Sequence, residues 1–107
     1  MEGKTMKKII NGKMYSTETA KEVGSWDNGR YRSDFHYVGE TLYKKKTGEF
    51  FIFGEGGAAS GYAERCGGNS TCFGEDIIPL SLQSAKEWVE RKLDADTYVE
   101  LFGEVEE

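Results

Sequence analysis

Glu49-Phe50-Phe51-Ile52-Phe53 is the stretch of this sequence that decides the fold class. In an extended strand, successive side chains point to opposite faces, so Phe51 and Phe53 share one face while Phe50 and Ile52 share the other. Both faces are therefore apolar, which is typical of a strand inside a covered sheet. We expect this strand to be central, with other parts of the protein packed on both of its faces.

The residues before this strand predict the first half of a β-hairpin. Phe35-His36-Tyr37-Val38 and Thr41-Leu42-Tyr43 contain the aromatic and β-branched residues that strands favour. Thr47-Gly48 places a glycine at the left-handed position of a hairpin turn. In this interpretation, the three lysines at 44–46 keep the turn or an edge of the sheet soluble.

The N-terminal part predicts a second hairpin and a short helix. Asn11-Gly12, within residues 7–15, is typical of a type I′ turn, whose two central residues both need positive φ. Ser16 or Thr17 can cap a helix over residues 17–23, and Gly24 can end it. A polar, turn-rich connection then follows over residues 25–34.

The C-terminal part predicts one strand and two helices. Residues 75–80 form a short strand, and Pro79 favours the end of this strand or a sheet edge. A helix begins near Ser81, with Ser84 and Glu87 at capping-box spacing and with Glu87 one turn before Arg91. Its apolar side chains share one face; they are Leu82, Ala85, Trp88, Val89 and Leu93. A last short helix begins at Asp94 or Asp96, carries apolar residues at 98, 99, 101 and 102, and ends at Gly103.

These elements predict one α+β domain over residues 1–107. Its small antiparallel sheet consists of two hairpins plus an extra strand, and it packs against the C-terminal amphipathic helix and two short helices. Residues 1–5 are interpreted as a flexible N-terminal extension and residues 104–107 as an acidic tail. No apolar run approaches the ~20 residues of a membrane span, and the charged N-terminus does not resemble a signal peptide. We therefore expect a cytoplasmic protein without membrane contact.

The charge is distributed unevenly. Residues 75–107 contain ten acidic and three basic side chains, a net charge of −7, whereas residues 1–74 contain nine and eleven, a net charge of +2; together they give −5. The acidic end argues against direct nucleic-acid binding, which usually needs a basic patch. It permits a protein partner with a basic surface, although an acidic end can also serve solubility alone.

Few side chains suggest catalysis, and we expect a protein that is not an enzyme and that needs no cofactor. The sole histidine, His36, lies in a predicted strand. Cys66 and Cys72 have no base beside them in the sequence, which a cysteine nucleophile would need. Two cysteines and one distant histidine also fall short of the usual four zinc ligands, so we expect no metal site. Both thiols are expected to be reduced.

The segment from Gly54 to Gly74 has seven glycines in 21 residues and predicts no regular element beyond one helical turn at residues 62–65. Long irregular segments of compact domains are often functional, and glycine lets a ligand approach the backbone closely. The segment matches neither a P-loop nor the dinucleotide-binding glycine pattern. One alternative function is therefore small-molecule binding, for example of a nucleotide signal. Its ligand would contact Gly54, Glu55, Gly56 and Gly57, and Arg65 would pair with its charge.

Several stretches of the chain are familiar as a set: Lys7-Lys8-Ile9-Ile10-Asn11-Gly12-Lys13, residues 40–51, Gly54-Glu55-Gly56-Gly57-Ala58, Ile77-Ile78-Pro79-Leu80 with the helix after it, and residues 93–104. From Met6 onward, the chain resembles a group of small proteins from phages and mobile elements of Gram-positive bacteria. This resemblance implies the cytoplasm of a bacterial host. It also implies an anti-CRISPR role, the inhibition of a Cas effector nuclease.

An acidic protein could block a Cas9-type effector by occupying the positively charged channel that holds nucleic acid. The C-terminal charge suggests four contacts for such a partner: Asp94, Asp96, Glu100 and Glu104. Trp26 and Tyr31 are candidate anchors, since exposed aromatic residues often carry binding energy. Both rings could equally hold their loop against the core. A regulatory role toward another phage or host protein is a further alternative.

Overall fold

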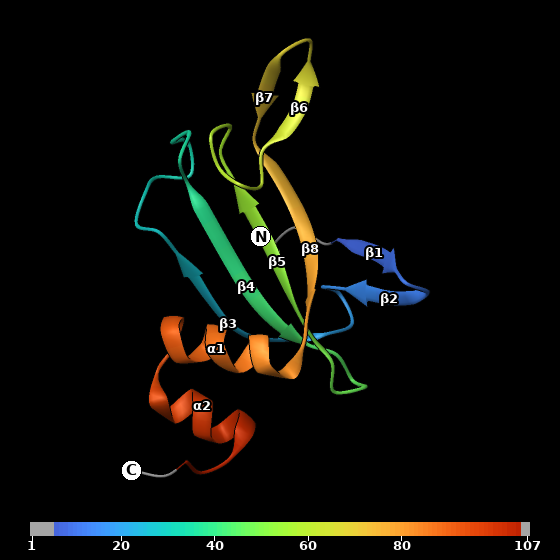
Figure 1. Cartoon of the computed structure of the whole chain (residues 1–107), viewed down its shortest axis with the longest axis vertical. Coiled ribbons are helices and arrows are strands. Elements are labelled where there is room, and N and C mark those ends of the chain that lie inside the picture. Colours follow the sequence, from blue (N-terminus) through green and yellow to red (C-terminus); the bar gives the residue numbers. More distant parts are fainter. Residues whose placement is uncertain (1–5, 106–107) are drawn as a thin grey trace.

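Four antiparallel strands form the central sheet, in the order β3 (Lys21–Asp27), β4 (Val38–Lys44), β5 (Phe50–Gly56) and β8 (Gly74–Leu80) (Figure 1). The computed structural model describes residues 6–105. Its strands are β1 (Lys7–Ile10), β2 (Lys13–Ser16), β3 (Lys21–Asp27), β4 (Val38–Lys44), β5 (Phe50–Gly56), β6 (Glu64–Gly67), β7 (Ser70–Cys72) and β8 (Gly74–Leu80), and its helices are α1 (Leu82–Lys92) and α2 (Ala95–Phe102). The predicted α+β class is confirmed, with helices at the C-terminal end of the chain.

Strand β5 is central, as its sequence predicts. It pairs with β4 on one side and with β8 on the other. Phe50 and Ile52 lie in the core under α1, together with Leu42, Trp88 and Val89. The helix covers this face because it presents apolar residues at helical spacing to an apolar strand face.

The opposite face of the sheet is covered by the β1–β2 hairpin. Phe51 and Ile77 are buried there against Tyr15. The Tyr15 ring meets Phe51 edge-on at 5.6 Å, and Tyr43 stacks on Phe51 at 5.3 Å. Two small cores thus lie on the two faces of one sheet, and β5 contributes to both.

The N-terminal hairpin is confirmed, but the predicted helix over residues 17–23 is wrong. Asn11 and Gly12 have φ values of 53° and 78°, as a type I′ turn needs. Residues 17–20 form a turn, and β3 then pairs with β4 along its length. The helix would have buried only two apolar side chains, whereas the strand gains a hydrogen-bond ladder, so tertiary pairing outweighs local preference. Gly24 therefore does not end a helix; a Cβ at this position would lie 2.8 Å from Leu93 Cδ1.

The glycine-rich segment also contains more regular structure than its composition predicts. Gly54 and Gly56 continue β5, because strands on both sides supply hydrogen-bond partners. Residues 64–72 form the β6–β7 hairpin, which projects from one end of the sheet (Figure 1). The predicted helical turn at residues 62–65 is wrong, since residues from 64 onward are extended.

The helix ends are set by side-chain caps. Ser81 caps α1, where the sequence predicts the helix to begin: its Oγ accepts a hydrogen bond from the Ser84 backbone N–H at 3.1 Å, so the Ser84–Glu87 spacing lies within the helix. Leu82 was expected to face inward but is 57% exposed, because it lies in the first turn, at the edge of the sheet. The predicted pair of Glu87 and Arg91 is present at 3.8 Å. Neither described helix is long and apolar enough to cross a membrane.

Strand β8 lies at an edge of the sheet, as Pro79 predicts. The flexible extension predicted for residues 1–5 and the last two residues of the predicted acidic tail lie outside the described part of the chain.

Candidate functional site

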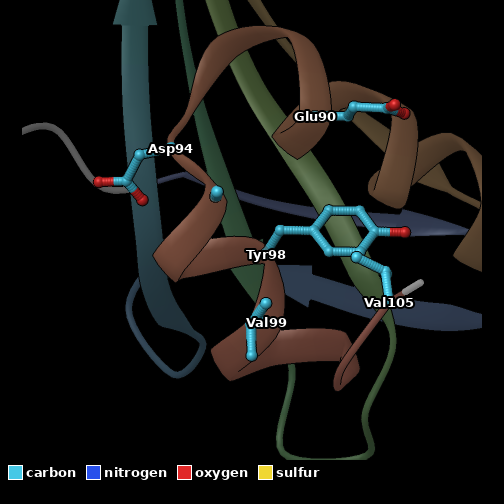
Figure 2. A pocket seen from close by; sticks show the side chains of 6 residues that line it. Glu90, Asp94, Tyr98, Val99 and Val105 are labelled. Carbon is cyan, nitrogen blue, oxygen red and sulfur yellow. The ribbon is translucent and has the colours of Figure 1, made fainter. Parts of the chain in front are cut away.

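An open groove of about 420 Å³ lies between the two helices and is closed on one side by Val105. Figure 2 shows the Tyr98 ring reaching toward Val105, with Glu90 of α1 above it and Asp94 at the other end of the groove. Val99 and Ala95 complete the apolar lining. We call this feature the helical groove: an apolar floor with a carboxylate at each end.

Asp94 lines the helical groove but also has a structural role. Its Oδ1 accepts a hydrogen bond from the Thr97 backbone N–H at 2.9 Å, which makes Asp94, and not the alternative Asp96, the N-cap of α2. Hydrogen bonds from the side chain and backbone of Thr97 lower the pKa of Asp94. Its carboxylate is therefore held in the charged form, and its replacement would damage α2 as well as the groove.

The other three predicted acidic contacts are exposed. Asp96 and Glu100 are one turn apart on the solvent side of α2, and Glu104 follows the end of the helix. Within residues 6–105, none of these three carboxylates forms an ion pair with a lysine or arginine. The structure thus places the acidic residues on and beside one helix, but only Asp94 of the four lines the helical groove, and Glu100 lines a hollow beside β3.

Glu100 occupies a position that costs helix stability. It lies in the last turn of α2, which contains no basic residue. A negative charge at a helix C-terminus opposes the macrodipole by roughly 0.3–1 kcal/mol. Glu100 also lines a hollow with Lys21 and Lys44, whose positive charges offset part of this cost.

The two candidate aromatic anchors differ in their surroundings. Tyr31 is 85% exposed in the loop between β3 and β4 and is available to a partner. Trp26 lies in β3, partly buried, and packs on the core under α1. The Lys92 Nζ lies 3.8 Å from the centre of its ring. For Trp26 the structure favours the core role that the sequence left open.

The residues of the alternative ligand site do not converge. Gly54 and Gly56 lie on the α1 side of β5, whereas Glu55 points to the other side and pairs with Arg32. A Cβ on Gly54 would lie 2.1 Å from Tyr62 Cζ, and one on Gly57 would lie 2.3 Å from a backbone oxygen. These glycines therefore allow close packing within the protein. Arg65 lies on the projecting β6–β7 hairpin.

A polar cluster around Glu40 was not predicted. Glu40 Oε1 accepts hydrogen bonds from Trp88 Nε1 at 2.8 Å and from Lys92 Nζ at 2.9 Å, and Oε2 accepts one from the Tyr62 hydroxyl at 2.7 Å. Burial opposes ionisation of Glu40, but these three hydrogen bonds outweigh it and lower its pKa. Burial, together with the bond to Glu40, raises the pKa of Tyr62. The available signal was strand periodicity, which places Glu40 on the same face as the buried Leu42.

The Glu40 cluster joins β4, α1 and the loop before β6. Every donor in it meets the carboxylate, so it resembles a structural clamp that fixes α1 on the sheet. No side-chain polar atom buried within the described residues lacks a hydrogen-bond partner. We therefore assign the Glu40 cluster to folding and the helical groove to candidate binding.

The side chains that could carry chemistry lie apart from both features. His36 is exposed in a loop and not in the predicted strand, and its backbone N–H donates to Asp34 Oδ1 at 2.7 Å. Cys66 and Cys72 are free thiols on the β6–β7 hairpin; a hydrogen bond with Cys66 raises the pKa of Cys72. Between residues 6 and 105, no cluster of three or more histidine, cysteine or acidic side chains could hold a metal ion. Comparisons with protein families, curated proteins and solved structures found no match for this chain.

Proposed function

We propose that this is a non-enzymatic binding protein whose helical groove and exposed α2 carboxylates engage a basic surface of a protein partner. The observation that carries the proposal is the groove itself, with an apolar floor and carboxylates of Glu90 and Asp94 at its ends. A lysine or arginine side chain has matching chemistry, since its aliphatic stem packs on apolar surface while its charged end seeks an acceptor. Asp96 and Glu100 extend the negative surface beyond the groove.

The partner that we propose is a Cas9-type effector nuclease, inhibited at a nucleic-acid channel, which corresponds to an anti-CRISPR role. The resemblance to small phage and mobile-element proteins and the acidic C-terminal third support this choice. Such a channel is lined with basic residues because it holds a phosphate backbone. A negatively charged protein is attracted to it over long range and competes with the nucleic acid.

The test is a DNA-cleavage assay with a guide-loaded Cas9-type effector and increasing amounts of the protein. The acidic variant reverses three charges, Asp96→Lys, Glu100→Lys and Glu104→Lys, and leaves the Asp94 cap intact. Three rim charges at roughly 0.5–1 kcal/mol each sum to about 1.5–3 kcal/mol, so we expect the inhibitory concentration to rise about 10- to 150-fold. Inhibition by the unaltered protein should also weaken as salt concentration rises.

A matched control reverses three exposed acids that line neither the groove nor the hollow beside Glu100, Glu18→Lys, Asp27→Lys and Glu64→Lys. It makes the same change in net charge, so it should keep inhibition if the α2 surface is the binding site. An equal loss of inhibition in both triple variants would indicate that net charge alone causes the effect. Full inhibition by a folded acidic variant would refute the α2 surface, and no inhibition by the unaltered protein would refute this partner.

A further inference from the structure

A second charged surface, of opposite sign, lies beside the turn between β4 and β5. An open hollow of about 370 Å³ is lined by Thr19, Ala20, Lys21, Lys44, Lys45 and Lys46. Four of these six residues are lysines and none is acidic. We call it the lysine hollow.

The fold assembles the lysine hollow from two distant parts of the chain. Lys21, at the start of β3, is the register partner of Lys44, at the end of β4. Lys45 and Lys46 follow in the β4–β5 turn, while Thr19 and Ala20 come from the turn before β3. Because the sequence predicted a helix over residues 17–23, it gave no reason to expect Lys21 beside the lysine run.

The lysines of the hollow have unequal freedom. Lys45 is fixed, since its Nζ lies 3.0 Å from Glu49 Oε1 and 4.1 Å from the centre of the Tyr15 ring. In the described part of the chain, Lys21, Lys44 and Lys46 form no ion pair, and the Thr19 hydroxyl makes no hydrogen bond. Lys44 Nζ lies 5.7 Å from the centre of the Phe50 ring, on the α1 side of the sheet, whereas Lys45 lies on the Tyr15 side. Lys21 and Lys46 are therefore the two lysines of the hollow without such a contact in the described residues, and a bound anion would supply a counter-charge for them.

We propose that the lysine hollow binds a compact oligophosphate, such as inorganic tripolyphosphate or the triphosphate of a nucleotide. Its volume falls within the range of about 300–1,000 Å³ that is typical of small-molecule sites. Ammonium groups suit phosphate oxygens as point charges, and the Thr19 hydroxyl adds a neutral donor.

The surroundings favour a compact anion over a long one. The next hollow along β3 is lined by Glu22 and Glu100, together with Lys21 and Lys44. Its carboxylates would repel the phosphates of a nucleic-acid strand that extended beyond the lysine hollow. The exposed acidic residues of α2 act in the same direction.

The experiment is isothermal titration calorimetry of the whole chain with inorganic tripolyphosphate at low ionic strength. The test variant, Lys21→Gln with Lys46→Gln, removes two unpaired charges from the hollow and keeps side-chain length. We expect binding about tenfold weaker or worse, since two charge-assisted contacts are lost. The control, Lys7→Gln with Arg65→Gln, makes the same change in net charge at exposed residues outside the hollow and should leave affinity nearly unchanged.

Three outcomes would overturn the proposal. The unaltered protein could fail to bind tripolyphosphate, or both double variants could lose affinity equally, which would indicate attraction to overall charge. A single-stranded oligodeoxynucleotide could also bind more tightly than tripolyphosphate at equal phosphate concentration. Circular dichroism of all variants separates lost binding from lost structure, and preferential binding of tripolyphosphate that depends on Lys21 and Lys46 would support the site.

Discussion

Replacement of Glu40 by alanine should destabilise the protein more than replacement of any exposed carboxylate. Its two oxygens accept hydrogen bonds from Trp88, Tyr62 and Lys92, which connect three separate parts of the chain. The side chains of Glu40 and Lys92 are only 17% and 24% exposed. Water can therefore replace the lost carboxylate only in part.

The magnitude follows from the donors that are left without an acceptor. A buried donor without a partner costs about 1–3 kcal/mol, and breaking a fully buried ion pair costs about 3–5 kcal/mol. Because Lys92 keeps some contact with water, we expect Glu40→Ala to lower the free energy of unfolding by about 2–4 kcal/mol. Glu40→Gln keeps one acceptor oxygen and should cost less, about 1–2 kcal/mol.

Urea unfolding at neutral pH, followed by tryptophan fluorescence, measures this change directly. Tryptophan fluorescence should report on the Glu40 cluster, because the rings of Trp26 and Trp88 both lie close to Lys92, which pairs with Glu40. With a urea dependence of about 1–3 kcal/mol per molar, the midpoint for Glu40→Ala should fall by roughly 1 M or more. Glu18→Ala is the control, because its side chain is exposed, and it should stay within about 0.5 kcal/mol of the unaltered protein. A loss below about 1 kcal/mol for Glu40→Ala would refute the clamp.

Three further predictions follow. Gly54→Ala should lower the free energy of unfolding in urea by about 1–3 kcal/mol, because the added methyl group would overlap the Tyr62 ring. Gly61→Ala is the control and should be nearly neutral, since its methyl group would meet nothing within 4 Å. Hydrogen bonds from two lysines and a threonine lower the pKa of Glu49 to about 2. The ionised carboxylate therefore stabilises the fold above the unfolded pKa of about 4.3, and this stabilisation is lost as the pH falls toward about 2. The urea midpoint of the unaltered protein should therefore drop more between neutral and acidic pH than that of Glu49→Gln. Mild oxidation with glutathione disulfide should form a disulfide between Cys66 and Cys72 within one chain, because their thiols are within hydrogen-bonding reach. Mass spectrometry should then show the loss of two hydrogens. A product that contains mixed disulfides with glutathione and no internal disulfide would contradict this prediction.

The parts of the fold that depend on local signals could be predicted from the sequence. Alternating apolar residues placed Phe50 and Phe51 on opposite faces of a central strand, and both faces are covered. Asn11-Gly12 determined a turn through its backbone preference, and Asp94 determined the start of α2 through its side chain. Each of these features is decided by residues within a few positions of one another.

Features that depend on distant residues could not be predicted in the same way. Residues 21–27 form a strand because they pair with β4, and no residue near them in the sequence indicates this pairing. The glycines at 54 and 56 extend a strand because neighbours pair with them on both sides. The helical groove and the lysine hollow are likewise products of packing, so the sequence identified acidic and basic residues without showing which of them share a surface.

The projecting β6–β7 hairpin offers a place to attach a reporter. Residues 64–71 are exposed, and none belongs to either core. An epitope or fluorophore-binding peptide inserted at Gly67-Gly68 should leave the sheet intact, since exposed turn tips tolerate insertion. An insertion directly after Val105 would instead disturb the helical groove, which Val105 lines. The hairpin is therefore the better attachment point for retrieving whatever this protein binds.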